Sequence, residues 1–173
     1  MIYCVGTTTV PNDEITISNN NIYDFFSTYT NSSGGVNTWG LYFGGTSGGS
    51  STTANINILN NCFYETTSLV NTGDNKGGHI VMSLVPSKSV KVQGNYIGGS
   101  APFCKGNTFT KSGNNTRFIG ILTSVETATG KIYIENNKIN NINWTNTGDE
   151  TFVTIGASSS QSSGNYIRMR ISI

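Results

Sequence analysis

Charged residues are scarce in this chain. Lys, Arg, Asp and Glu together make up 11% of its 173 residues, and the formal net charge is +1. A soluble domain usually carries about 25% charged residues. The basic residues are scattered and form no stripe. Composition therefore gives no electrostatic argument for binding nucleic acid, and we expect no such partner.

Long apolar runs are also missing. No run of about 20 apolar residues occurs, so we expect no insertion into a membrane. Met1 to Val5 lack the basic and apolar regions of a secretory signal peptide. We expect residues 1–173 to be a single domain, and a module of a larger extracellular or cell-surface protein whose signal peptide is absent from this chain.

Cysteine and histidine are rare. Cys4, Cys62 and Cys104 make an odd number, so at least one thiol is unpaired in a monomer, and the sequence does not choose partners for a disulfide. No CxxC or Cys/His spacing occurs. We expect no metal ion and no cofactor.

The chain is rich in Asn, Gly, Ser and Thr, and it contains a repeat. With Φ for an apolar residue, the pattern is Φ-x-Φ-x-(Asn/Gly)-Asn-x-Φ. Its copies begin at Ile15, Ile56, Val90 and Ile132, so they are 41, 34 and 42 residues apart. A weaker copy includes Ser163 to Ile167.

Each repeat unit reads as three strands. A strand precedes each copy, at residues 2–5, 39–43, 79–84, 117–122 and 152–155, and a further short strand follows at 23–26, 64–70, 139–144 and 167–173. Alternation of apolar and polar residues places the apolar side chains on one face of a strand. One unit cannot bury that face alone, whereas stacked units share a core. The pattern predicts an all-β, parallel β-helix (β-solenoid) of about five irregular coils.

Asparagine recurs at one corner of the predicted coil. Asn tolerates left-handed backbone and bonds within its own turn. Stacked coils would bring these amides into a ladder, each donating to the next coil. The predicted ladder consists of Asn20, Asn61, Asn95 and Asn137, with Asn165 extending it. A β-sandwich is the competing fold, but its strands would not be expected to repeat one sequence with Asn at one corner.

The repeat resembles the parallel β-helix repeats of secreted bacterial and phage proteins. The segment from Gly94 to Phe109 also resembles parts of bacterial surface proteins with right-handed β-helices. This resemblance implies a right-handed coil, a direction that crossover chirality also favours. It leaves function open, because the repeat family includes lyases, glycosidases, tailspikes and adhesins.

Two pairs of residues are candidates for acid/base chemistry. Asp24 and Glu65 occupy equivalent positions after the Asn turn, so we expect them on neighbouring coils and on one face. A glycosidase uses two carboxylates about 5 to 9.5 Å apart. Asp74 and His79 flank a Gly-rich loop and form a second candidate pair. Two carboxylates without a basic partner make a weak site, and a strand-edge histidine beside a turn is the simpler explanation of His79.

Tyr23 and Tyr64 share one position in the repeat. If they face outward, their rings could stack on sugars. A wet aromatic patch or a contact with a neighbouring domain is the alternative explanation.

The function we expect is a non-catalytic structural or adhesive module, with end-to-end self-assembly into fibres as a further expectation. An uncapped coil offers unpaired backbone groups to another chain. The alternative is a polysaccharide-binding or polysaccharide-cleaving β-helix. Expected partners are therefore a second copy of the chain and a polysaccharide.

Overall fold

The computed structural model describes residues 1–4, 12–28, 37–44, 53–73, 75–125, 130–148, 151–159 and 166–171. These residues form β-strands and one short 3₁₀ turn, η1 (Pro102–Cys104). The strands make three sheets, in which every pairing of strands is parallel. The described residues include no helix long and apolar enough to cross a membrane. The prediction of an all-β chain with parallel strands is confirmed, and the antiparallel sandwich is excluded.

The first sheet contains one strand from each repeat unit. Its strands lie in sequence order: β1 (Ile2–Cys4), β4 (Thr38–Phe43), β8 (Asn75–Leu84), β12 (Thr116–Val125) and β15 (Phe152–Ser159). The apolar positions are in register across the sheet, with Leu41 opposite Met82 and Met82 opposite Ile121. These are the strands predicted at the start of each unit, and several of them are longer than predicted.

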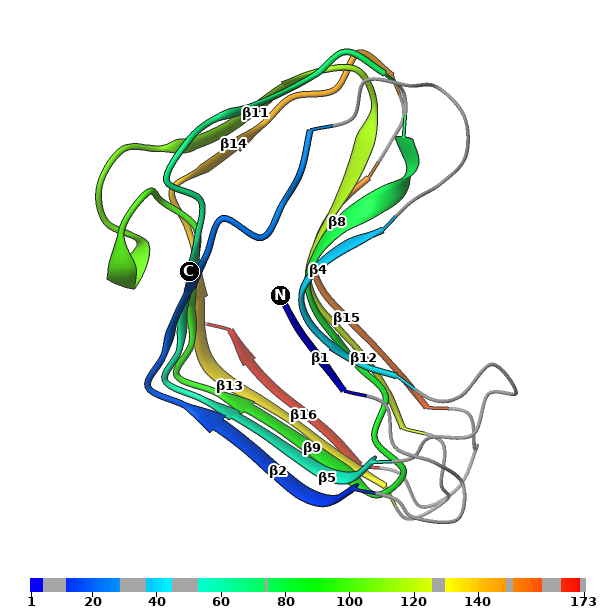
Figure 1. Cartoon of the computed structure of the whole chain (residues 1–173). Coiled ribbons are helices and arrows are strands. Elements are labelled where there is room, and N and C mark those ends of the chain that lie inside the picture. Colours follow the sequence, from blue (N-terminus) through cyan, green and yellow to red (C-terminus); the bar gives the residue numbers. More distant parts are fainter. Residues whose placement is uncertain are drawn as a thin grey trace.

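The second sheet contains the repeated pattern itself and is curled. One part has the order β2 (Asn12–Ser18), β5 (Thr53–Leu59), β9 (Ser89–Gln93) and β13 (Lys131–Ile139), with β16 (Tyr166–Ile171) also paired to β13. The other part has β3 (Asn21–Tyr23), β6 (Cys62–Tyr64), β10 (Tyr96–Ile97) and the end of β13. The chain turns between the two parts at the corner predicted from the Asn positions (Figure 1).

The third sheet is the smallest, with β7 (Leu69–Asn71), β11 (Phe109–Gly113) and β14 (Ile142–Trp144). The stretch after the corner therefore holds two short strands in most units, where the sequence predicted one. The predicted strand at residues 167–173 belongs elsewhere. Ile167 lies opposite Ile132, so β16 pairs with the first part of β13.

Apolar side chains from all three sheets fill one interior, which the sheets surround (Figure 1). Ile56, Val90 and Ile132 form one column across the second sheet, and each is at most 1% exposed. The next inward residues, Ile58, Val92 and Ile134, are also fully buried. Burying a side chain of this size contributes about 1.5–3 kcal/mol. The Φ-x-Φ pattern thus identifies core residues correctly.

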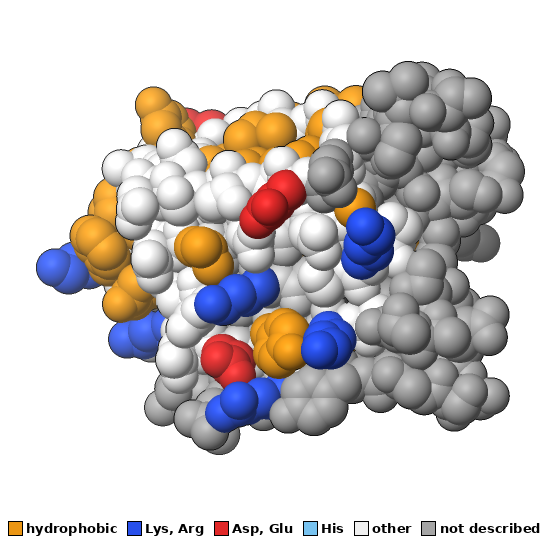
Figure 2. Space-filling model, turned by 90° about the horizontal axis from the view of Figure 1, so that it is seen from below, with side chains coloured by type: hydrophobic (Ala, Val, Ile, Leu, Met, Phe, Trp, Pro, Cys, Tyr) orange, Lys and Arg blue, Asp and Glu red, His pale blue; other side chains and the backbone are white. Residues whose placement is uncertain are grey.

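The outer face of β2, β5, β9 and β13 is mostly polar, and Lys and Arg side chains gather over part of it together with single acidic ones (Figure 2). Across this face the outward residues change from Thr16 and Asn57 to Lys91 and Tyr133 in successive strands. One ion pair joins Arg168 Nε to Glu135 Oε1 at 2.9 Å. No basic or acidic stripe runs along the described part of this face.

Candidate functional site

The four corner asparagines Asn20, Asn61, Asn95 and Asn137, which we call the asparagine column, stack on neighbouring strands. Asn61 Oδ1 accepts from the backbone N and Nδ2 of Asn20, at 3.0 and 3.1 Å. Asn95 Oδ1 accepts the same pair of bonds from Asn61, and Asn137 Oδ1 accepts them from Asn95. The predicted ladder of these four amides is present. Asn165 lies outside the described residues, and the residue opposite Asn137 is Ile171.

Each amide in the column also bonds the main chain. The Nδ2 atoms of Asn61, Asn95 and Asn137 donate to Ile17 O, Ile58 O and Val92 O at 2.8–2.9 Å. Asn61 and Asn95 are completely buried, and a buried polar group left without a partner costs about 1–3 kcal/mol. The column therefore holds the corner together from inside.

The residue before each column asparagine faces outward. These outer corner positions are Asn19, Asn60, Gly94 and Asn136, and all four have positive φ, between 55° and 69°. Asn and Gly are the residues that adopt this backbone at least cost. The three outer asparagines are exposed. Among the described residues, their side-chain amides make no hydrogen bond, in contrast to the hydrogen-bonded column beside them.

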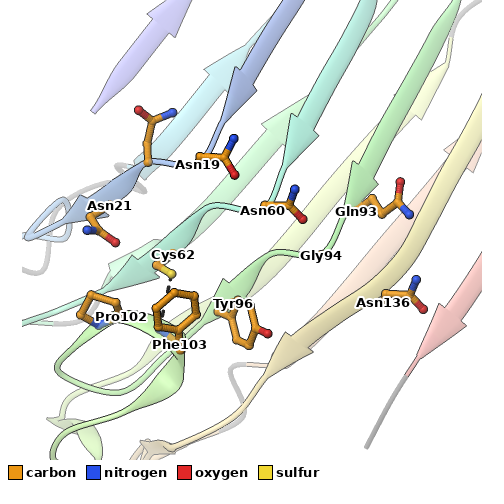
Figure 3. A pocket seen from close by; sticks show the side chains of 11 residues that line it. Asn19, Asn21, Asn60, Cys62, Gln93, Gly94, Tyr96, Pro102, Phe103 and Asn136 are labelled. Atoms are coloured by element: carbon orange, nitrogen blue, oxygen red, sulfur yellow. Dashed lines mark hydrogen bonds between the residues drawn. The ribbon is translucent and has the colours of Figure 1, made fainter.

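A groove runs along the outer corner positions. It encloses about 680 Å³, a size typical of small-ligand sites. Figure 3 shows its side chains: outer corner residues along one side, and Cys62, Tyr96, Pro102 and Phe103 on the other. Asn20, Asn21 and Gln93 complete the lining. No charged residue lines the groove, whose surface consists mainly of amides and aromatic rings, and the ammonium group of Lys105 lies 6.0 Å from the centroid of the Phe103 ring.

The aromatic side of the groove is a loop at residues 100–107 that follows β10 and includes η1. Backbone bonds from Ser100 N and Ala101 N to Lys105 O, at 3.0 and 3.1 Å, close the loop. Phe103 N donates to Cys62 Sγ at 3.4 Å and anchors it to β6 (Figure 3). Phe103 has a φ of 63° and is 54% exposed. A bulky residue with positive φ is strained, and here the strain presents an apolar ring to solvent.

The Cys104 thiol in this loop lies in an environment that disfavours the thiolate. Cys4, Cys62 and Cys104 are all free. Burial raises the pKa of the Cys104 thiol, and its sulfur lies 3.3 Å from Ile97 O, to which it donates. A nucleophilic cysteine needs a lowered pKa. The environment of Cys104 therefore suits packing and not nucleophilic chemistry.

Tyr23 and Tyr64 stack on each other, as their shared position in the repeat predicts. Tyr23 lies opposite Tyr64 in the paired strands β3 and β6, with ring centroids 5.3 Å apart and an interplanar angle of 14°. By strand alternation, Tyr23 points to the same side of β3 as Asn21, which lines the groove. The stack ends after two rings, because Gly98 follows in the next unit.

Asp24 and Glu65 lie in neighbouring units, as predicted, but they do not share a face. Asp24 has a φ of 51° and is exposed, and its carboxylate accepts bonds from Thr66 N and Oγ1 at 2.8–2.9 Å. Glu65 is 3% exposed, and Glu65 Oε1 accepts from the backbone N of Phe25 and Phe26, both at 3.1 Å. The positive φ at Asp24 turns its side chain away. Asp24 and Glu65 therefore do not form a pair of carboxylates that could flank one glycosidic bond.

Burial raises the pKa of Glu65 to about 7, although its bonds from Phe26 and Phe25 oppose that shift. Such a pKa would suit a general acid. The carboxyl group is nevertheless buried and accepts hydrogen bonds from the backbone N–H groups of Phe25 and Phe26. In this position Glu65 caps the chain that follows β3.

His79 is completely buried, and it is not a strand-edge residue. Its Nδ1 lies 2.7 Å from Thr38 Oγ1 and its Nε2 3.4 Å from Asn71 Nδ2. Burial and the charge of Lys111 lower the pKa of His79 to about 3. Asp74 lies outside the described residues, so its pairing with His79 stays a prediction.

One polar cluster was missed by sequence reasoning. Lys111 is completely buried, and its Nζ donates to Asn114 O, Thr145 O and Asn146 Oδ1. The ammonium also lies 5.5 Å from the centroid of Trp144. Lysine is almost never buried unless it is paired. A lysine in a strand is therefore expected to face solvent, and nothing in the sequence indicated that Lys111 is buried. The described residues contain no group of three or more His, Cys, Asp or Glu able to hold a metal ion.

Comparisons with protein-family models, with curated proteins and with solved structures found no match to this chain. The interpretation of the groove therefore depends on its own geometry.

Proposed function

We propose that this chain is a right-handed parallel β-helix module of an extracellular or cell-surface protein, with a structural and adhesive role and no catalytic activity. The observation that carries this proposal is the asparagine column, which joins four successive units through amide and backbone bonds. Units stacked in this way share one core and make a rigid support.

The positions and hydrogen bonds of the candidate acid/base residues support a role without catalysis. Asp24 and Glu65 each bond main-chain amides of the neighbouring unit, so both carboxylates link units together. His79 sits in the core with a depressed pKa. Glu65 and His79 are buried, and the exposed Asp24 is held by hydrogen bonds from Thr66, so all three polar groups are engaged in the fold.

The experiment measures retention and cleavage together. The chain is incubated with insoluble polysaccharides, and both the bound protein and the release of new reducing ends are measured. An adhesive module is retained on at least one polysaccharide without releasing product. Retention on none of them, or release of product at a rate that depends on the chain, overturns the proposal.

A polysaccharide-cleaving enzyme is the second candidate, and the pKa of Glu65 near 7 is the observation that favours it. Glu65→Gln keeps the hydrogen-bond acceptor and removes the acid. Cleavage that is lost in Glu65→Gln would establish the enzyme. Unchanged retention without cleavage in both proteins favours the adhesive module.

Self-association is part of the proposal for a structural role. β1, β2 and β3 each pair with one described strand, so their other edges carry backbone groups able to pair with a further strand. Ile2, Tyr3 and Tyr23 are exposed on these strands. Light scattering of the purified chain at rising concentration tests this part: growth in mass supports stacking of a second copy, and a constant monomer mass rejects it.

A further inference from the structure

The outer corner positions display uncharged hydrogen-bonding groups at regular steps. Each side-chain amide offers both a donor and an acceptor, and neighbouring strands are about 4.8 Å apart. The amides of Asn19 and Asn60 lie one unit apart, and Asn136 lies two units beyond Asn60. This row suits a ligand with many hydroxyl groups, because each hydroxyl is likewise both a donor and an acceptor.

The opposite side of the groove supplies an apolar surface. Tyr96 and Phe103 meet edge to face, with centroids 5.2 Å apart. Phe103 combines a positive φ with an exposed ring, and such strained residues concentrate at functional sites. A sugar ring has one apolar face of C–H groups, and aromatic rings pack well against such a face.

The main chain at the corner is unsuited to binding a peptide as an added strand. Asn19 N, Asn60 N and Gly94 N already donate to Leu59 O, Gln93 O and Glu135 O, at 2.9–3.1 Å. Peptides that add to a sheet need free backbone groups at its edge. The N–H groups at these three positions are therefore not available to a ligand, and no side chain that lines the groove is charged.

We propose that the groove binds an uncharged carbohydrate chain that lies along the outer corner positions, with a sugar ring against Phe103. This inference rests on the proposed adhesive function and names the ligand class. Gly94 is central to it. The other three units have Asn at this position, whereas Gly94 has no side chain, and Asn60 Oδ1 lies over it between Asn60 and Asn136 (Figure 3).

Gly94 can be replaced by a residue that the fold accepts elsewhere. The φ of 69° at Gly94 is close to the 55–59° that Asn adopts at the three equivalent positions. A Cβ there would meet Asn60 Oδ1, which is the end of a side chain and can rotate away. Gly94→Asn should therefore fold and obstruct the groove. Asn60→Gly is the reciprocal variant, and Phe103→Gly removes the ring while keeping its backbone conformation.

The experiment titrates the whole chain with neutral hexasaccharides (cellohexaose, maltohexaose, laminarihexaose and xylohexaose) by calorimetry. Hexagalacturonate and an uncharged peptide of alternating Gly and Ser serve as competing ligand classes. We expect at least one neutral hexasaccharide to bind, and Phe103→Gly and Gly94→Asn each to weaken that binding by about tenfold, a loss typical of one good contact. Asn60→Gly should weaken it by about threefold.

Tyr3→Ala is the matched control, because Tyr3 is also an exposed ring, stacked on Tyr42 in the first sheet. Its affinity should equal that of the parent chain. The inference is overturned if no neutral hexasaccharide binds, if hexagalacturonate or the peptide binds more tightly, or if the groove variants bind like Tyr3→Ala. If the chain is retained on a polysaccharide and the groove variants are retained equally well, the adhesive function is supported and the groove inference is wrong. If the chain cleaves a saccharide that it binds in the groove, the proposal of a non-catalytic function is wrong and the groove inference is unaffected.

Discussion

Asn61 and Asn95 are joined by two hydrogen bonds between neighbouring strands: Asn95 Oδ1 accepts from Asn61 N at 2.9 Å and from Asn61 Nδ2 at 3.1 Å. Both residues are completely buried. A single amide oxygen therefore satisfies a main-chain and a side-chain donor of the unit beside it. This relationship repeats along the asparagine column and makes each corner dependent on the next.

Replacing one member of the column should be costly. Asn95→Ala removes the acceptor for two buried donors on Asn61, and the donor to Ile58 O. We expect the free energy of unfolding to fall by about 3 kcal/mol, measured by urea denaturation. Asn60→Gly changes an exposed neighbouring asparagine at positive φ and should lower it by less than about 0.5 kcal/mol. Equal losses in the two variants would contradict a special role for the column.

The repeat predicted this part of the structure because strand alternation and turn chemistry are local. Asn20 to Asn137 share one pattern of neighbours, so their stacking follows once the units are parallel. The failures have long-range causes. Tyr166–Ile171 reads as a strand after a corner, yet it pairs with the beginning of β13. Which unit a strand joins depends on the register of the whole sheet.

The candidate site was predicted less well than the fold. The groove depends on a loop at residues 100–107 that matches no other unit, and on Gly94, which within the pattern looks like an ordinary substitute for Asn. The burial of Glu65, His79 and Lys111 depends on which unit covers them. No local sequence pattern encodes this burial. Residue types that are common in active sites therefore suggested candidates that in the structure are buried in the core.

Glu65 should make the chain less stable as pH rises. Its pKa is about 7 in the folded chain and 4.5 as a free side chain, so the folded state holds the proton more tightly. Stability is therefore greatest below pH 4.5 and is lost between pH 4.5 and about 7, by up to about 1.4 kcal/mol per pH unit. Glu65→Gln should abolish this loss. An unchanged pH slope of the urea midpoint in Glu65→Gln would show that the carboxyl is ionised throughout.

His79 should act in the opposite direction. Its pKa is lowered to about 3 from 6.5, so the folded state resists protonation. Stability is fully present above pH 6.5 and is lost as pH falls from 6.5 toward 3, by up to about 1.4 kcal/mol per pH unit. Between pH 4.5 and 6.5 the two residues oppose each other in the parent chain. His79→Gln should then show stability falling with rising pH, and Glu65→Gln stability rising; parallel slopes in the two variants would refute the assignment.

The buried Lys111 should contribute to the stability of the folded chain. Lys111→Met retains most of the side-chain volume but removes the donor to Asn114 O, Thr145 O and Asn146 Oδ1. We expect a loss of about 3 kcal/mol in the free energy of unfolding. Lys91→Met, at an exposed position of β9, should change it by less than about 0.5 kcal/mol. Similar urea midpoints for the two variants would mean that the buried ammonium is dispensable.

Side-chain amide hydrogen exchange, followed by NMR, measures the stacking of the corner asparagines directly. The Nδ2 protons of Asn61, Asn95 and Asn137 are held in inter-strand bonds, whereas those of Asn60 and Asn136 face solvent. We predict exchange at least about 100-fold slower for the first three than for the last two, because only opening of the core releases them. Uniformly fast exchange at all five residues would contradict the asparagine column, and with it the parallel stacking of the repeat units.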